Sequence, residues 1–331
     1  MIDKDTSDRP RRRTALIDME LENIKADITA LQEVRLSDEG HIQETERTFF
    51  WKGCPAGQPR RAGVAFAIRN QLGSRLEEHP RGISERIMTL RIRVAQNRYI
   101  TLINVYAPTM TYPEEEREAF YAQLRAFITS IPAASKIILL GDFNARVGSD
   151  HETWAPALGK FGRGQQNSNG ELLAGLCVEL DLAVTNTFFQ QPDNHYFSWI
   201  HPRSKRPHLL DYVITRRKDL KDIRNTRAMR GPDCHTDHYL VKTTLNLCVK
   251  PVFNRTDPHR KRRLNTSKLE EESTRQELKR AINLALEGRP DEQFTLEQEW
   301  NTLSKAVLDS AVEVLGYRKK HGADWFNPHD Q

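Results

Sequence analysis

The chain has 331 residues, which is enough for one large domain or for a large and a small one. Its 50 Lys and Arg residues against 45 Asp and Glu give a net charge of +5, too small to indicate nucleic-acid binding by itself. Its four cysteines are scattered and form no C-x-x-C pair, which argues against a disulfide framework. No apolar run approaches the ~18 residues of a membrane helix, and the charged N-terminus is unlike a signal peptide. We therefore expect the protein in the nucleus or the cytoplasm.

The first predicted element is a helix over residues 10–25, because Ile17, Leu21 and Ile24 recur at helical spacing. An apolar strand follows within residues 27–36 and ends at Glu33. Apolar and β-branched residues then predict three more strands and a helix with an acidic first turn: strands at 63–69, 86–94 and 99–108, and a helix at 113–128. Strands and helices alternate irregularly, which indicates a mixed α/β fold and not a strict βαβ order.

The segment KIILLGDFNARVG, residues 136–148, is the most informative one. Ile137–Leu140 predict a short buried strand that Gly141 ends, and Asp142 and Asn144 follow. Residues two apart on an extended backbone point the same way, so we expect a carboxylate and an amide to face one crevice at the strand's carboxyl end. A plain Asp-x-Asn turn after a strand is the alternative.

Two later segments repeat this arrangement. The strand predicted at 208–216 carries Asp211, and Asp237 and His238 stand just before another strand. Acidic side chains at strand ends are costly unless they are paired or bound to metal, and a divalent cation shared by all of them is a common explanation. A zinc site built on Cys234 and its neighbours is disfavoured, because the spacing fits no common zinc motif. A helix is predicted at 169–182, with Asn169 as a plausible cap.

Basic residues gather in two places. Six Lys or Arg and one acid occupy residues 250–263, and a second cluster runs from His201 to His208. A solvated charged loop is the alternative for each cluster. Beyond residue 265 two helical patterns follow, the second with an apolar stripe from Leu296 to Val314. We therefore divide the chain into a main domain over residues 1–248, a basic linker over 249–265 and a helical extension over 266–331.

Five motifs in order resemble the endonuclease/exonuclease/phosphatase superfamily, over roughly residues 14–247. They are Leu-Gln-Glu at 31–33, Tyr-Ala-Pro at 106–108, Gly-Asp-Phe-Asn at 141–144, Leu-Asp-Tyr at 210–212 and Thr-Asp-His at 236–238. The FNARVG, CxxTDH and SWIHPRS segments resemble the endonuclease domain of LINE retrotransposons of the RTE type. The family of craniofacial development protein 2-like proteins resembles the same domain. The tail ending in YRKKHGADWF resembles the segment that precedes the reverse transcriptase in such elements.

The resemblance implies a four-layer sandwich of two mixed β-sheets flanked by helices, and hydrolysis of a DNA phosphodiester with Mg²⁺, or Mn²⁺ in its place. It implies that Glu33 binds the metal with Asp237 near it, that Asp142 orients or deprotonates water, and that Asn144 binds phosphate or water. It further implies that His238 contacts a phosphate oxygen with Asp211 fixing its ring, and that Tyr106 donates to a phosphate or leaving oxygen. Candidate DNA contacts are Asn167, Ser198, Trp199, Arg203, Lys205 and Arg206, with Asn169 beside Asn167; a hairpin at 201–208 touches DNA in the resembled enzymes.

One departure from the resembled pattern affects the expected activity. Family members begin with a strand whose Asn helps to hold the metal, and this chain starts too late to contain that strand. Two other functions therefore stay open beside an active endonuclease. One is a DNA-binding or chromatin-associated protein that has lost catalysis, and the other is a phosphodiesterase of the same fold with an abasic-site or small-molecule substrate. The sequence leaves the oligomeric state and the target sequence open.

Overall fold

A computed structural model describes residues 12–74, 76–95, 98–231, 236–246, 264–286 and 296–317. The chain divides into two compact units, Met1–Val252 and Phe253–Gln331. Most of the predicted linker, the tail from residue 318, and Cys234 lie outside the described residues. Within the described part of the chain, no helix is both long and apolar enough to cross a membrane.

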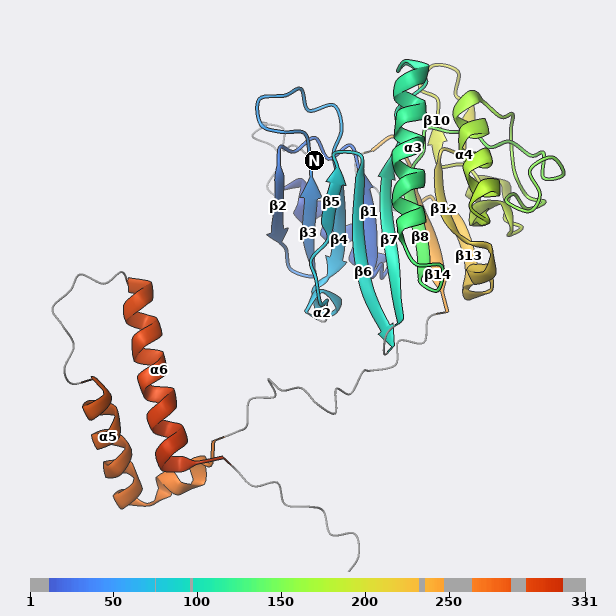
Figure 1. Cartoon of the computed structure of the whole chain (residues 1–331). Helices are drawn as coiled ribbons and strands as arrows, with labels where there is room; N and C mark the ends of the chain where they lie inside the picture. The colour runs from blue at the N-terminus through green and yellow to red at the C-terminus, as the bar shows by residue number, and fades with distance from the viewer. Residues whose placement is uncertain are drawn as a thin grey trace, which may run out of the picture. The chain divides into compact units, whose positions relative to one another are not determined.

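The first sheet is antiparallel and has the strand order β1-β4-β3-β2 (Figure 1). Its strands are β1 (Ile28–Gln32), β2 (Glu39–Gln43), β3 (Arg47–Lys52) and β4 (Val64–Arg69). All residues of β4 except Arg69 are buried, because both faces of this central strand are covered.

The second sheet has the order β5-β6-β7-β8-β12-β9. Its strands are β5 (Arg81–Ser84), β6 (Ile87–Ala95), β7 (Arg98–Tyr106), β8 (Lys136–Asp142), β9 (Leu182–Val184) and β12 (Asp211–Arg216). Strands β7 and β8 are parallel and flank helix α3 (Glu114–Ser130) in sequence, whereas the other pairs are antiparallel. A parallel pair needs such a crossover, since a tight turn cannot join strands that run the same way.

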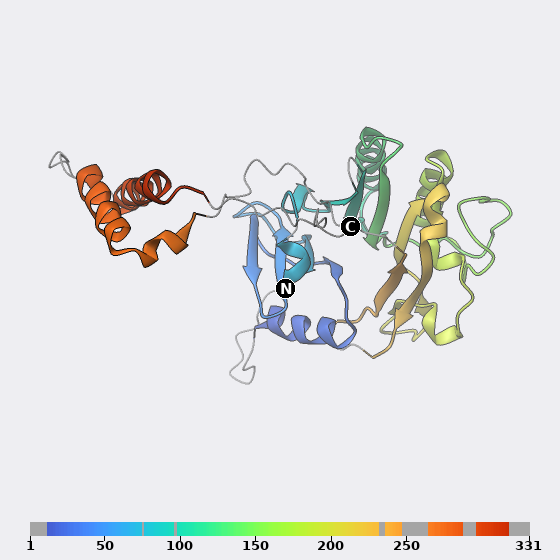
Figure 2. The same ribbon diagram turned by 90° about the horizontal axis from the view of Figure 1, so that it is seen from below.

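Three apolar clusters separate four layers. Helix α1 (Arg13–Asn23) buries Ile17 and Leu21 against Phe49 of the first sheet. Phe66 and other side chains of the first sheet meet the inner face of the second. The outer face of the second sheet packs on α3 and on α4 (Ser168–Glu179). Figure 2 shows α1 and α3 on opposite outer sides of the sandwich. The expected fold class, two sheets flanked by helices, is therefore confirmed.

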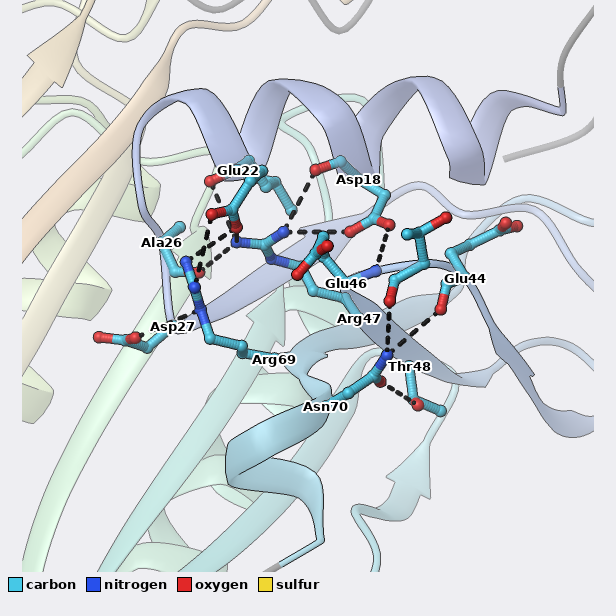
Figure 3. A network of polar contacts seen from close by, with 12 residues as sticks. Asp18, Glu22, Ala26, Asp27, Glu44, Glu46, Arg47, Thr48, Arg69 and Asn70 are labelled. Carbon is cyan, nitrogen blue, oxygen red and sulfur yellow. Dashed lines mark hydrogen bonds and ion pairs between the residues drawn. The ribbon is translucent and has the colours of Figure 1, made fainter.

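A buried ion-pair network attaches α1 to the first sheet (Figure 3). Arg47 of β3 is fully buried, and its guanidinium contacts Asp18 at 3.0 Å and Glu22 at 3.1 Å. It also donates to the backbone carbonyls of Leu21 and Ala26, at 3.1 and 2.7 Å. One side chain thus fixes the end of α1 and the start of β1.

A cavity of about 1250 Å³ has both β1 and β14 (Leu240–Leu245) in its lining. Strand β14 pairs only with β13 (Ile223–Met229) among the described residues, and β1 pairs only with β4 there. Leu240 packs against the cluster under α1, and Val241 and Leu245 pack against the inter-sheet cluster. The β13–β14 ribbon therefore lies in the layer of the first sheet.

The remaining elements are short or lie in the second unit. They are α2 (Asn70–Gly73), the hairpin of β10 (Trp199–Ile200) and β11 (Pro207–His208), and 3₁₀ turns at Thr185–Thr187, Asp193–His195, Arg217–Asp222 and Thr266–Glu270. The second unit contains α5 (Glu272–Leu286) and α6 (Leu296–Leu315). Trp300 of α6 is 67% exposed, and Leu303 and Val307 are also exposed, so much of the predicted apolar stripe is uncovered within this unit.

Candidate active site

Strand register brings three predicted site residues into one row across the second sheet. Tyr106 of β7 pairs with Asp142 of β8, and Asp142 pairs with Asp211 of β12. Side chains opposite each other on neighbouring strands are about 5 Å apart at Cβ. The row stands at the carboxyl ends of the parallel strands β7 and β8, where such sheets hold their ligands.

Gly141 lets this row form. Its φ is +147°, and a Cβ added there would lie 2.0 Å from the carbonyl oxygen of Val105 on β7. We predicted that the strand ends at Gly141, but β8 continues to Asp142 because glycine allows this backbone conformation without a break.

Replacing Gly141 by alanine is expected to destabilise the chain and to displace Asp142. The backbone conformation alone costs a residue with a Cβ roughly 1–3 kcal/mol, and the contact with Val105 adds to it. Urea unfolding measures the loss. Gly175, where an added Cβ meets nothing within 4 Å, supplies the control; an equal loss in both alanine variants would contradict the role of Gly141.

Asp142 is buried and accepts a hydrogen bond from the backbone nitrogen of Asn144 at 2.8 Å. Burial raises the pKa of its carboxyl well above the usual range, and the nearby carboxylates of Asp211 and Glu33 raise it further. His238 and the Asn144 hydrogen bond oppose this rise only in part. The site therefore contains a carboxyl that exchanges protons far more readily near neutrality than a surface aspartate does.

His238 is paired with Asp211 at 2.9 Å through Nδ1. Burial lowers the pKa of His238, but Asp211, Asp142 and Asp237 outweigh it and raise the pKa to about 10. Ligand atoms of Asp142, Asp211 and His238 all lie within 4.8 Å of one another. With Nδ1 held by Asp211, Nε2 is the ring nitrogen left for a substrate.

Glu33 follows β1 directly and has a positive φ of 51°. Its carboxylate accepts a hydrogen bond from the hydroxyl of Tyr106 and pairs with Arg35 at 2.9 Å. Burial and the Glu33 carboxylate both raise the pKa of the Tyr106 hydroxyl, which therefore acts as a donor. Glu33 is not part of the Asp142, Asp211 and His238 cluster, but it lines the same cavity as Asp211 and His238.

Asn144 reaches the site by a route other than strand alternation. It has a positive φ of 46°, so the expectation of an extended backbone from Asp142 to Asn144 is wrong. Its backbone nitrogen binds Asp142, and its side-chain amide donates to the carbonyl of Ala107 at 2.9 Å. Strained conformations of this kind persist where surrounding contacts hold them.

The residue that caps α4 is Asn167 and not Asn169. Asn167 caps α4, since its side chain accepts from Gly170 at 2.9 Å, whereas Asn169, our predicted cap, is fully buried inside the helix. The Asn169 amide donates to the carbonyls of Pro108 and Asn144, both at 3.0 Å. It thereby joins two loops of the site, which sequence spacing does not reveal.

The segment at 198–208 lies beside His238. Trp199 donates its indole N–H to Asp237 at 2.9 Å, and its ring lies 6.2 Å from the His238 ring. Ser198, a predicted DNA contact, is fully buried, and its hydroxyl accepts from the backbone nitrogens of Leu210 and Asp211 at 3.1 Å. It supports Asp211 instead of facing solvent. The cationic side chains of this hairpin are exposed: Arg203, Lys205 and Arg206.

Comparison with known proteins identifies the family of this chain. The endonuclease/exonuclease/phosphatase family matches residues 3–238. Craniofacial development protein 2 of Bos taurus is 28% identical over 282 residues, which cover 83% of this chain and 45% of that protein. The chain thus spans about half the length of this curated relative.

Solved structures share the fold at low sequence identity. The catalytic domain of Xenopus laevis APE2 superposes with a TM-score of 0.50 and 16% identity over 71% of this chain and 88% of its own. An AP endonuclease from Archaeoglobus fulgidus gives 0.51 and 14%, over 71% and 94%. Since the family match spans more than half of the sequence, the chain belongs to the endonuclease/exonuclease/phosphatase family.

Proposed function

We propose that this chain hydrolyses phosphodiester bonds of DNA with a divalent metal ion, Mg²⁺ first and Mn²⁺ as the alternative. The observation that carries the proposal is the row of Tyr106, Asp142 and Asp211, with His238 held by Asp211 at its end. The retrotransposon-like motifs FNARVG and SWIHPRS favour DNA as the substrate and an origin in a LINE-type element.

The residues present suit a hard cation. The carboxylates of Asp142 and Asp211 are close enough to repel each other when both are ionised, and a cation between them would relieve this repulsion. The exposed carboxylates of Glu33 and Asp237 lie nearby. In this proposal Glu33 and Asp237 bind the metal ion, and Asp142 and Asp211 lie beside it. When bound, such an ion supplies positive charge to the phosphate oxygens and lowers the pKa of bound water.

The protein's own groups perform the remaining steps. Asp142 orients the attacking water and accepts its proton, which its raised pKa favours. His238 is protonated at neutral pH and donates from Nε2 to a phosphate oxygen, while Asp211 holds its ring. The Asn144 amide keeps one N–H for phosphate or water after binding Ala107, and Tyr106 positions Glu33.

Plasmid nicking tests the proposal. The purified chain is expected to convert supercoiled plasmid to the nicked form in Mg²⁺ and to stop on addition of EDTA, with His238→Gln inactive and His151→Gln active. His151 lies in a turn at 151–157 and is not among the residues that line the cavity. Nicking that persists in EDTA would contradict metal dependence. Salt-sensitive binding without cleavage would indicate a DNA-binding protein, and a panel of intact, abasic and inositol-phosphate substrates identifies the substrate class.

The exposed cations of the 199–208 hairpin are expected to bind DNA phosphates. Substituting alanine for Arg203, Lys205 and Arg206 together should weaken DNA affinity roughly tenfold or more and lower the slope of log K against log salt by up to about 2.7. Fluorescence anisotropy at several salt concentrations measures both. The matched control replaces Arg217, Lys221 and Arg224, which are exposed near the other end of β12. Equal losses in the two triple variants would show that the hairpin is not a specific contact.

A further inference from the structure

Asn104 is a buried amide in an apolar environment. It lies on β7, is fully buried, and occupies the face of the strand that carries Leu102 and Tyr106 into the inter-sheet cluster. A polar side chain in such a place is costly unless its hydrogen bonds are made. The contacts that it makes therefore indicate what it does.

All three hydrogen bonds of its side chain cross from the second sheet to the first. The Asn104 oxygen accepts from Nε2 of Gln32 at 2.7 Å. Its nitrogen donates to the carbonyl oxygens of Leu31 at 3.1 Å and of Ala65 at 2.7 Å. Leu31 and Ala65 are cross-strand partners in the β1–β4 pair. One amide thus binds both members of a strand pair and the residue just before Glu33.

This attachment matters because β1 is held by one strand only among the described residues and lines the cavity. An edge strand has few contacts that fix its register, and a slip of one residue would reverse the direction of every side chain. Two residues after Asn104, on the same face of β7, Tyr106 binds the Glu33 carboxylate. Strand β7 therefore holds the end of β1 at two points.

We propose that Asn104 is a positioning residue that, from β7, fixes the register of β1 on β4 and so holds the Glu33 carboxylate in the site. Its consequence for metal binding rests on the proposed function, whereas its consequence for the register of β1 does not. Gln32 takes part as the partner of the Asn104 oxygen.

The experiment compares Asn104→Leu, which keeps the size and removes the hydrogen bonds, with Thr226→Val. Thr226 is also buried, and its hydroxyl is bonded to those of Thr185 and Thr243 on elements that do not include β1. Amide hydrogen exchange of residues 28–33, without metal or substrate, is expected to accelerate about tenfold in Asn104→Leu and to stay unchanged in Thr226→Val. Mn²⁺ affinity, measured by electron paramagnetic resonance, should weaken about 10–100-fold in Asn104→Leu alone.

Each outcome decides the matter. Unchanged exchange at residues 28–33, or equal acceleration in both variants, would overturn the proposal. Accelerated exchange in Asn104→Leu with no Mn²⁺ binding by the wild type would support the register role and count against the proposed function. If Asn104→Leu does not fold, Gln32→Met, which removes only one of the three hydrogen bonds, is expected to show a smaller acceleration confined to residues 28–33, and unchanged exchange there would overturn the proposal.

Discussion

Replacing Asp142 by asparagine is expected to lower metal-dependent hydrolysis by about 10²–10⁴-fold and, in metal-free buffer, to stabilise the fold. The amide keeps the shape and the acceptor for the Asn144 backbone, but it cannot accept a proton from water. It also removes a carboxyl whose ionisation is disfavoured by burial and by Asp211. Active sites often trade stability for function in this way.

The pH dependence of stability tests the same variant. The folded-state pKa of Asp142 is raised, so the stability that its protonated form contributes is complete below its unfolded value of about 4 and is lost as the pH rises through the folded value. His238 acts in the same direction: its contribution is complete below about pH 6.5 and is lost as the pH rises toward about 10. The urea concentration at the midpoint of unfolding, measured in EDTA, should therefore fall as the pH rises in the wild type. It should fall less steeply in Asp142→Asn.

Asp150 supplies the control for this experiment. It is exposed, and hydrogen bonds from Thr153 hold the pKa of its carboxyl below the usual range. Asp150→Asn is therefore expected to leave hydrolysis unchanged and to follow the wild-type slope above about pH 5. Parallel stability curves for the wild type and Asp142→Asn would show that Asp142 ionises normally and would contradict its assignment as a proton acceptor.

Replacing Arg47 by methionine is expected to lower the free energy of unfolding by about 3–5 kcal/mol, a large share of the stability of an ordinary domain. The guanidinium is fully buried, so its loss leaves the buried carboxylate of Asp18 without its 3.0 Å partner and the carbonyls of Leu21 and Ala26 without a donor (Figure 3). Urea unfolding followed by circular dichroism measures the change.

Two further variants separate the cause. The double variant Arg47→Met with Asp18→Leu is expected to recover part of the loss, because no unpaired charge is then buried. Arg12→Ala breaks an ion pair between Arg12 and Glu44, in which the arginine side chain is 56% exposed. It should therefore lower the free energy of unfolding by less than about 1 kcal/mol. A cost for Arg47→Met no larger than that of Arg12→Ala would mean that the network does not hold α1 to the sheet.

Local sequence pattern was enough for much of the fold. Strands at 64–69 and 98–106 and the helix at 114–130 lie within about two residues of their predicted bounds, since apolar periodicity reports which side of an element is buried. The order of the five motifs likewise placed Tyr106, Asp142, Asp211 and His238 in one family site, and the register now sets three of them side by side. Their catalytic roles stay predictions.

Tertiary contacts decided the rest. Asn144 adopts a positive φ because Asp142 and Ala107 hold it, Asn169 turns inward to the carbonyls of Pro108 and Asn144, and Ser198 is buried under Asp211. Asn104 and Arg47 look like ordinary polar residues in strands until the partners that bury them are known. The sequence by itself determined which elements form and which chemical groups are available, because both are local properties. Which polar groups face each other depended on the packing of segments far apart in the chain, because hydrogen bonds need a partner at a defined distance and direction.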